Sequence, residues 1–231
     1  MIQQIEDRIA ALYHADVAVA VLPVAADHPP LLPVEEPAIA RAVPGRRAEF
    51  TAGRAAARLA MQRLGLMPQA VPAAPDRSPI WPAGLTGSIS HAAGFCAAVL
   101  AREAGQRLGL DIEDPAPLDT DLWPLVLTPD EIASLDLLPA TARGLAAKRI
   151  FGIKEAAYKA QFPLTGAVIG FQALQVTLTD GGAAARVAAT RIGQRVPGLA
   201  ALFPASGTGC GLAGPDDRGG GLLIAAMTLP S

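Results

Sequence analysis

The stretch GLDIED at residues 109–114 decides the fold and the chemistry that this sequence predicts. Apolar and acidic residues alternate in it, which is typical of a β-strand, because successive side chains of a strand point to opposite faces. Asp111 and Glu113 therefore share one face, while Leu110 and Ile112 point into the core. Two carboxylates flanked by apolar residues suit a hard divalent cation such as Mg²⁺. A solvent-facing edge strand with charged alternation is the other interpretation.

A second informative stretch, KRIFGIKEAAYKA, occupies residues 148–160 and is predicted to be helical. At about 100° per residue, Lys148, Glu155 and Lys159 fall within one narrow face of such a helix. Glu155 would add a third carboxylate to the cation site, and the lysines would neutralise phosphate oxygens. An ordinary solvated ion pair is the alternative interpretation of the same residues.

Arginines and a histidine upstream supply candidate anion ligands. Arg47, Arg54 and Arg58 form one stripe of an alanine-rich helix, with Arg46 in its first turn. Such a stripe is either a solvated face or, if phosphate is the ligand, a binding site. In GSISHAAG, residues 87–94, the pair Ser90 and His91 lies in a small-residue turn. No GxSxG elbow surrounds the serine, so it is not expected to be a nucleophile, and the histidine is either structural or functional.

The remaining pattern predicts alternating strands and helices. A strand at residues 89–102 and a second at 107–113, separated by Gly105, are expected to form a hairpin. Residues 218–221 (RGGG) lack the spacing of a phosphate loop and are expected to be a flexible connection. The other predicted strands span residues 17–22, 175–179 and 222–228. One helix is predicted over residues 46–64, and another is expected to begin at Pro129, after the cap residue Thr128. A third helix is predicted over residues 141–160 and is expected to end before Pro163.

Composition excludes several classes of protein. The 231 residues are 51% hydrophobic and 17% charged, which excludes wholesale disorder, and a net charge of −2 argues against a general binder of nucleic acid or membrane surfaces. The two cysteines, Cys96 and Cys210, lack metal-ligand spacing and are expected to be free thiols in a reducing cytoplasm. No signal peptide is predicted, because the N-terminal residues contain acids and show no basic start followed by an apolar block. No transmembrane segment is predicted, because prolines, glycines and His91 interrupt the uncharged residues 78–101.

Taken together, the motifs resemble those of the 4′-phosphopantetheinyl transferases, in particular the monomeric type that includes the surfactin and enterobactin enzymes. GLDIED matches the family pattern G-[IVL]-D-[IVL]-E, and FGIKEAAYKA at residues 151–160 matches F-x-x-K-E-[SA]-x-x-K. GSISH at residues 87–91 matches S-[IVL]-S-H. Residues 46–65 and 77–91 look closest to the enterobactin-type branch. Gly152 stands where Ser, Cys or Ala is more usual.

The resemblance implies an α+β fold of the sandwich-like 4′-phosphopantetheinyl transferase type. Two similar subdomains, residues 1–108 and 109–231, would be related by a pseudo-twofold axis, with coenzyme A in the cleft between them. A monomer would then suffice. The implied enzyme is of the holo-[acyl-carrier-protein] synthase type: with Mg²⁺ or Mn²⁺, it would transfer 4′-phosphopantetheine from coenzyme A to a serine of an apo acyl or peptidyl carrier protein. Its pathway would be non-ribosomal peptide, siderophore or polyketide synthesis.

Site residues follow from the same resemblance, position by position. Asp111, Glu113 and Glu155 would be the metal-site carboxylates, with Glu155 or a metal-held water as the base. Lys159 would neutralise the pyrophosphate, and Lys154 would lie close to the transferred group. The 3′-phosphate and adenosine end would be held by Arg46, Arg54, Arg77 and His91, and Ser90 would hydrogen-bond the nucleotide.

Two other functions fit the same residues. One is a Mg²⁺-dependent phosphohydrolase that cleaves a nucleotide like coenzyme A without a protein acceptor. The other is a catalytically silent module that binds coenzyme A or a carrier protein. The three carboxylates and the lysines argue against a silent module.

Overall fold

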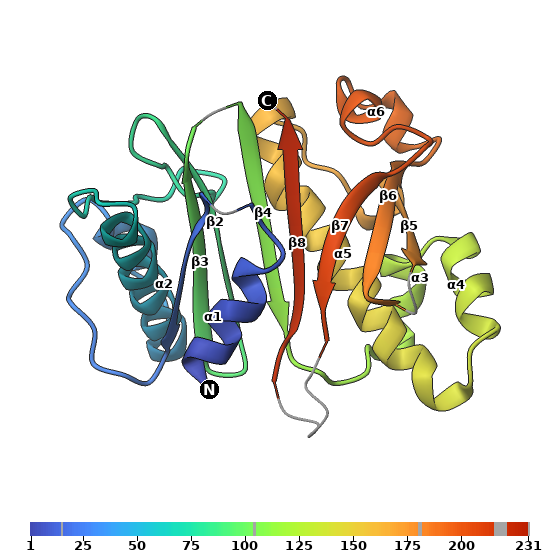
Figure 1. Ribbon diagram of the computed structural model, residues 1–231, viewed down its shortest axis with the longest axis horizontal. Coiled ribbons are helices and arrows are strands. Elements are labelled where there is room, and N and C mark those ends of the chain that lie inside the picture. Colours follow the sequence, from blue (N-terminus) through green and yellow to red (C-terminus); the bar gives the residue numbers. More distant parts are fainter. Residues whose placement is uncertain (15, 104, 180–181, 215–220, 231) are drawn as a thin grey trace.

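Two antiparallel sheets form the framework of the chain (Figure 1). The computed structural model describes residues 1–14, 16–103, 105–179, 182–214 and 221–230, so residues 218–220 of the expected connection lie outside it. The smaller sheet has the order β1-β3-β2 and the larger sheet the order β4-β8-β7-β6-β5. The strands are β1 (Ala18–Pro23), β2 (Leu85–Ala92), β3 (Phe95–Arg102), β4 (Gln106–Glu113), β5 (Leu174–Thr179), β6 (Ala184–Ala189), β7 (Thr208–Ala213) and β8 (Leu223–Pro230).

Each sheet packs against one long helix, which confirms the predicted α+β class. Helix α2 (Pro44–Arg63) covers the small sheet and α5 (Ala140–Thr165) covers the large one (Figure 1). The shorter helices are α1 (Ile2–Ala10), α3 (Trp123–Val126), α4 (Pro129–Asp136), α6 (Leu199–Leu202) and the 3₁₀ turns η1 (Glu36–Ile39), η2 (Thr120–Leu122), η3 (Phe171–Ala173) and η5 (Gly193–Arg195). None of the helices within the described ranges has the length and apolar character needed to cross a bilayer.

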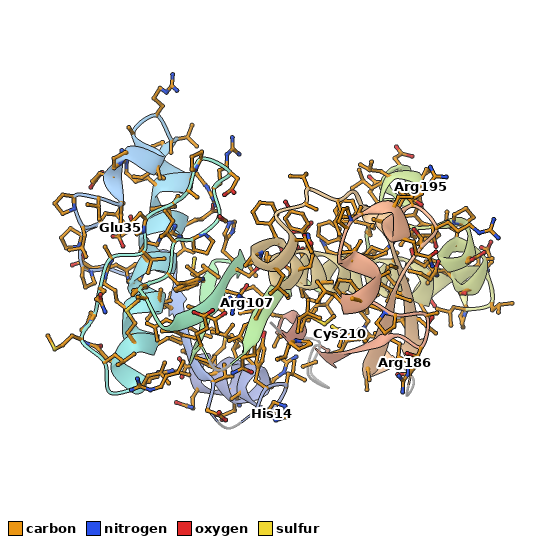
Figure 2. The ribbon with its side chains drawn as sticks, turned by 90° about the horizontal axis from the view of Figure 1, so that it is seen from above. His14, Glu35, Arg107, Arg186, Arg195 and Cys210 are labelled. Carbon is orange, nitrogen blue, oxygen red and sulfur yellow. The ribbon has the colours of Figure 1, made fainter. Side chains whose placement is uncertain are left out.

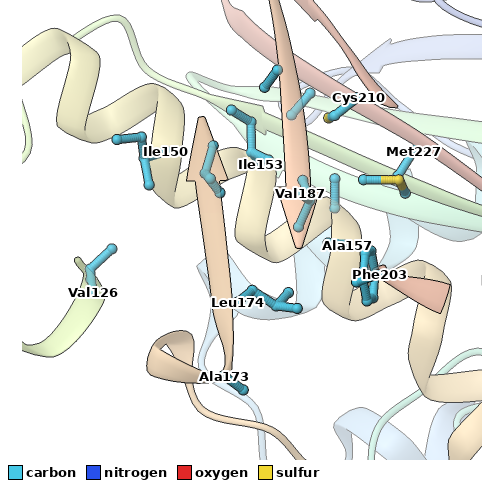
Figure 3. Packing of buried hydrophobic residues seen from close by; sticks show 14 of the residues in the cluster. Val126, Ile150, Ile153, Ala157, Ala173, Leu174, Val187, Phe203, Cys210 and Met227 are labelled. Atoms are coloured by element: carbon cyan, nitrogen blue, oxygen red, sulfur yellow. The ribbon is translucent and has the colours of Figure 1, made fainter. Parts of the chain in front are cut away.

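The apolar core has three parts, which follow from this layering. One lies between α2 and the small sheet, and one lies between α5 and the large sheet, where Ile153, Val187 and Met227 pack together (Figure 3). The third joins both sheets to α1 and contains Ile9, Leu108, Leu110 and Ile112. The predicted inward direction of Leu110 and Ile112 is therefore confirmed, and α1 covers the junction of the two sheets.

Local sequence explains where the two long helices begin and end. Pro44 opens α2 at the position where its missing N–H costs nothing, and Gly65, at φ 71°, follows the last turn. The expectation that α5 ends before Pro163 is wrong, because α5 continues to Thr165. Proline removes its own N–H and crowds the carbonyl four residues earlier, but the last turn still closes at Gly166, which has φ 63° and donates its N–H to the carbonyl of Phe162.

The predicted hairpin between residues 89–102 and 107–113 is also wrong. The hairpin is formed by β2 and β3, and it turns through Ala93 and Gly94, which both have positive φ. Strand β3 bonds to β1 on one edge and to β2 on the other, so it has no free edge for β4. Strand β4 pairs instead with β8, over its whole length from Gln106 to Glu113.

Strands β2 and β4 meet through serine side chains, at a junction that we call the seam. Ser88 Oγ accepts the N–H of Leu110 at 3.0 Å, and Ser90 Oγ accepts the N–H of Ile112 at 3.2 Å. Both residue pairs advance together along the chain, so the strands run in the same direction. The seam joins the two sheets and fixes which residue of β2 faces which residue of β4.

The predicted boundary between residues 108 and 109 falls inside β4. Because all of β4 pairs with β8, we propose that the division lies between β3 and β4 instead. The pseudo-twofold relation of the two halves stays a prediction.

Close packing of α5 on β4 depends on Gly109. A Cβ atom at this position would overlap the carbonyl of Ala156 in α5. We therefore expect Gly109→Ala to lower the free energy of unfolding by about 1–3 kcal/mol or more, the usual cost of overpacking a core. Chemical denaturation measures this. Gly45→Ala, in open space in the first turn of α2, is the matched control and should not destabilise the chain. Equal stability of the two variants would contradict this account of the packing.

Candidate functional site

A pocket of about 360 Å³ lies across the seam and brings the two predicted residue sets together. Every predicted site residue except Lys154 lines it. The small-sheet half contributes a basic end and the large-sheet half an acidic end. The lining consists of Arg46, Glu49, Phe50, Gly53, Arg54, Arg77, Pro79, Ile89, Ser90, His91, Asp111, Glu113, Glu155 and Lys159.

The acidic end is built around Asp111, which is 4% exposed. Its Oδ1 accepts hydrogen bonds from Ser90 Oγ at 2.9 Å and Lys159 Nζ at 2.7 Å. Its Oδ2 is buried and has no hydrogen-bond partner among the residues that the structure describes. A buried carboxylate oxygen without a partner is costly in free energy, so Oδ2 is the atom in this pocket that most needs a donor or a cation.

Lys159 and Ser90 hold this aspartate in place. The ammonium of Lys159 donates to Ser90 Oγ at 3.2 Å, to the carbonyl of Leu110 at 3.0 Å and to Asp111, which uses all three of its donors. Ser90 donates its one proton to Asp111, and the hydrogen bond between Ser90 and the nucleotide that the resemblance implies stays a prediction. Ser90 lines the pocket as a support of Asp111.

The other two carboxylates have different surroundings. Glu113 pairs with Lys148 at 2.8 Å. Within the described part of the chain, no cation lies within 4 Å of the Glu155 carboxylate. Burial raises the pKa of both glutamates, and the nearby carboxylates raise it further, while the nearby lysines lower it. Among the described residues, no three acidic, histidine or cysteine side chains are gathered closely enough to hold a metal ion as they stand.

The basic end is held mainly by α2 and β2. Arg46 Nη1 lies 2.7 Å from His91 Nε2 and 3.2 Å from Glu49 Oε2. A guanidinium can only donate, so this His91 nitrogen accepts and is unprotonated. Burial lowers the pKa of His91, and the charge of Arg46 lowers it further while Glu49 opposes this. A phosphate placed here would meet a guanidinium and a neutral imidazole, because the lowered pKa disfavours protonation of His91.

Arg54 contributes a guanidinium with an unpartnered nitrogen. Its plane lies over the Phe50 ring at 3.9 Å, and its Nε donates to the carbonyl of Val71 at 2.7 Å. Nη2 is buried, and no described residue is its hydrogen-bond partner. Burial lowers the pKa of Arg54 to about 10, so it is charged at neutral pH. Sequence analysis did not identify Phe50 as a partner of Arg54. Their spacing of four residues on α2, which places the two side chains next to each other, was the available signal.

Arg77 approaches the pocket from a loop. Its φ of 72° is unusual for a residue other than glycine. The side chain of Asp76 accepts from the N–H and the hydroxyl of Ser78, and the N–H of Arg77 donates to the carbonyl of Ala74. These bonds hold the turn in the conformation that brings Arg77 to the pocket.

Of the basic residues that sequence analysis singled out as candidate ligands, Arg47, Arg58, Lys148 and Lys154 do not line this pocket. Arg58 forms a buried ion pair with Glu35 beside α2, in the half of the molecule away from Arg186 and Cys210 (Figure 2). The prediction that Lys154 lies beside the transferred group is corrected by the structure. Its ammonium is buried, 2.7 Å from the Glu131 carboxylate and 2.9 Å from the carbonyl of Val126. Adjacent helical residues point about 100° apart, so Glu155 faces the pocket and Lys154 faces the core.

Glu131 is the residue that the sequence did not reveal as a partner of Lys154. It lies in the capping box of α4, where its Oε2 accepts from the N–H of Thr128, and its Oε1 accepts from the N–H of Val176. The carboxylate therefore joins α4, β5 and α5 below the pocket.

We expect Glu131→Ala to destabilise the chain by about 3–5 kcal/mol, because it leaves the Lys154 ammonium buried without a counter-charge. Thermal and chemical unfolding measure this. Asp130→Ala is the matched control, since Asp130 is the neighbouring acid and is exposed. Similar small effects of the two substitutions would show that the buried ion pair does not hold these elements together.

Comparisons with known proteins give a consistent match. Residues 34–101 match the family model described as the 4′-phosphopantetheinyl transferase N-terminal domain, and residues 107–196 match that of the 4′-phosphopantetheinyl transferase superfamily. The chain is 37% identical to 4′-phosphopantetheinyl transferase PptT of Mycobacterium tuberculosis, over 63% of this chain and 64% of that protein. The match thus spans less than two thirds of the mycobacterial protein.

Two further relatives extend this similarity. The chain is 38% identical to 4′-phosphopantetheinyl transferase Npt of Nocardia iowensis, over 65% of this chain and 68% of that protein. It is 41% identical to enterobactin synthase component D of Salmonella typhimurium, over 57% of this chain and 55% of that protein.

Proposed function

The chain belongs to the 4′-phosphopantetheinyl transferase superfamily, and on that premise we propose that it transfers 4′-phosphopantetheine from coenzyme A to a serine of an apo carrier protein. The observation that carries the proposal is the pocket across the seam, which has a basic end and an acidic end in one cavity. Coenzyme A carries a 3′-phosphate and a pyrophosphate at separate positions, which is the charge pattern that such a pocket complements.

At the basic end, Arg46, Arg54, Arg77 and His91 would bind the 3′-phosphate. The unpartnered Arg54 Nη2 is a donor available to an anion, and the neutral His91 can donate only from Nδ1, since its Nε2 accepts from Arg46. Glu49, 3.7 Å from His91, lies on the same side and limits the net positive charge there.

At the acidic end, Asp111, Glu113 and Glu155 would hold Mg²⁺. Their chemistry fits this ion, because all three are hard oxygen ligands and Asp111 Oδ2 is a buried acceptor without a partner. When bound, Mg²⁺ would supply positive charge that offsets the charge developing on the leaving pyrophosphate oxygen. Mn²⁺ accepts the same ligand set.

Glu155 would be the base for the acceptor serine. The serine oxygen bonds to the β-phosphorus of coenzyme A, the bond from that phosphorus to the bridging oxygen breaks, and 3′,5′-ADP leaves with the electron pair. The serine proton passes to Glu155. Burial raises the pKa of Glu155, which makes its carboxylate a stronger base than an exposed one. Lys159 holds Asp111 and adds a positive charge beside the pyrophosphate.

The acceptor would be a carrier protein of non-ribosomal peptide, siderophore or polyketide synthesis. Similarity to enterobactin synthase component D supports the siderophore class. The active unit would be a monomer, because this chain by itself supplies both the basic and the acidic end of the pocket.

Intact-mass spectrometry tests the transfer directly. We expect an apo peptidyl carrier protein, incubated with this chain, coenzyme A and Mg²⁺, to gain the mass of one phosphopantetheine group and to gain nothing when EDTA is present. Asp111→Asn, with its fold checked by circular dichroism, should give no mass gain, because it removes the charge that the cation and Lys159 require. Breakdown of coenzyme A without any mass gain would instead identify a hydrolase.

Neighbouring arginines on α2 provide a matched test of the 3′-phosphate site. Arg46 and Arg47 have side chains of similar exposure, 49% and 44%, but Arg47 points to Glu36 and the carbonyl of Ile39, away from the pocket. We expect Arg46→Ala to weaken coenzyme A binding about tenfold or more, the value of a charge-assisted hydrogen bond.

Calorimetry with two ligands completes this test. Binding of 3′-dephospho-coenzyme A should change little in Arg46→Ala, and Arg47→Ala should bind both ligands like the parent chain. Equal losses for both ligands in Arg46→Ala would remove the 3′-phosphate from this end of the pocket.

A further inference from the structure

A lysine outside the proposed machinery is paired with one of its carboxylates. Lys148 Nζ lies 2.8 Å from Glu113 Oε2, and it also lies over the ring of Phe151, 5.4 Å from the ring centroid. The two side chains of the pair are 17% and 22% exposed. The ion pair is therefore screened from bulk water on most sides, and its ammonium still reaches solvent.

In the absence of a divalent cation, this ion pair neutralises part of the negative charge at the acidic end. Asp111 is matched by Lys159, and Glu113 is matched by Lys148, so two of the three carboxylates already have a positive partner. The described residues contain no acidic cluster that is ready to hold an ion. A cation that takes Glu113 as a ligand must therefore compete with Lys148 for that carboxylate.

Lys159 and Lys148 differ in how easily each can be displaced from its carboxylate partner. Lys159 is held by three acceptors, two of them on β4 and one on β2, and its release would break the seam around Asp111. Among the described residues, Lys148 has its ion pair with Glu113, on the rim of a small cavity. Lys148 is thus the counter-ion that can be displaced without disturbing the seam.

Gly152 provides room for that displacement. A Cβ atom at this position would lie 3.3 Å from Asp111 Oδ2 and 3.8 Å from Glu113 Cγ. The cavity beside it is lined by Asp111, Glu113 and Lys148. Glycine at this position keeps a side chain out of the space beside Asp111 Oδ2, so Glu113 would have room to turn toward that oxygen when its ion pair with Lys148 breaks.

We propose that Lys148 is a positioning residue that occupies Glu113 in the cation-free chain and competes with the divalent cation for it. This inference rests on the proposed function, because it takes the three carboxylates as the cation site. Lys148 would make the cation bind weakly to the free chain and more tightly once a bound pyrophosphate adds negative charge. The chain would then take up coenzyme A and the cation together, in preference to the cation alone.

Mn²⁺ binding without coenzyme A tests the competition apart from catalysis. The free Mn²⁺ signal in electron paramagnetic resonance measures the dissociation constant for the parent chain, Lys148→Met and Lys148→Arg. We expect Lys148→Met to bind Mn²⁺ about fivefold more tightly, the fold-change that corresponds to losing a partly exposed ion pair. Lys148→Arg keeps the charge and should bind like the parent chain. Lys148→Gln is a second charge-removing variant if the methionine variant does not fold.

The outcomes separate this inference from the function on which it rests. Unchanged or weaker Mn²⁺ binding in both charge-removing variants would overturn the role of Lys148 and leave the cation site standing. Asp111→Asn, introduced into the parent chain and into Lys148→Met, should abolish binding in both. If neither the parent chain nor Lys148→Met binds Mn²⁺, the cation site itself fails, and the inference fails with it.

Discussion

The seam between β2 and β4 is the constraint on which the rest of the structure depends. Two serine hydroxyls, Ser88 and Ser90, take the N–H groups of β4 that would otherwise lack a partner at this edge. The same Ser90 hydroxyl donates to Asp111. One side chain, that of Ser90, therefore joins the two sheets and also orients the aspartate at the centre of the pocket. A change that moved Ser90 would disturb both the contact between the sheets and the site.

Charge is balanced around this seam in a way that favours a polyanion with a cation. The basic end presents guanidinium donors, one of them buried without a partner, and the acidic end presents a buried carboxylate oxygen without a partner. Each of these atoms is unfavourable alone. A ligand that brings a phosphate to one end and a pyrophosphate with Mg²⁺ to the other would give both atoms a partner. A coenzyme A site therefore accounts for the two ends of the pocket together.

Sequence patterns predicted the elements whose signals are local. The glycine after α2, the cap residue Thr128 and the alternation in β4 each act within a few residues, and these predictions were confirmed. The predicted start of α2 at Arg46 was wrong, because the helix already begins at Pro44. The hairpin failed because the partner of β4 is β8, more than one hundred residues later in the chain. Lys154 was misplaced for a related reason: its position depends on Glu131 of α4, a contact that no spacing within residues 148–160 specifies. The site residues on β4 could be predicted because side chains alternate between the two faces of a strand, so the sequence alone shows that Asp111 and Glu113 share a face.

A crystal structure of the chain with coenzyme A and Mg²⁺ is the most direct test of the central claim, that the pocket across the seam binds both ends of one coenzyme A molecule. The account predicts the 3′-phosphate within hydrogen-bond distance of Arg46 and His91, and the pyrophosphate and the metal beside Asp111 and Glu155. Coenzyme A bound outside this pocket, or bound with its pyrophosphate away from Asp111, would contradict it.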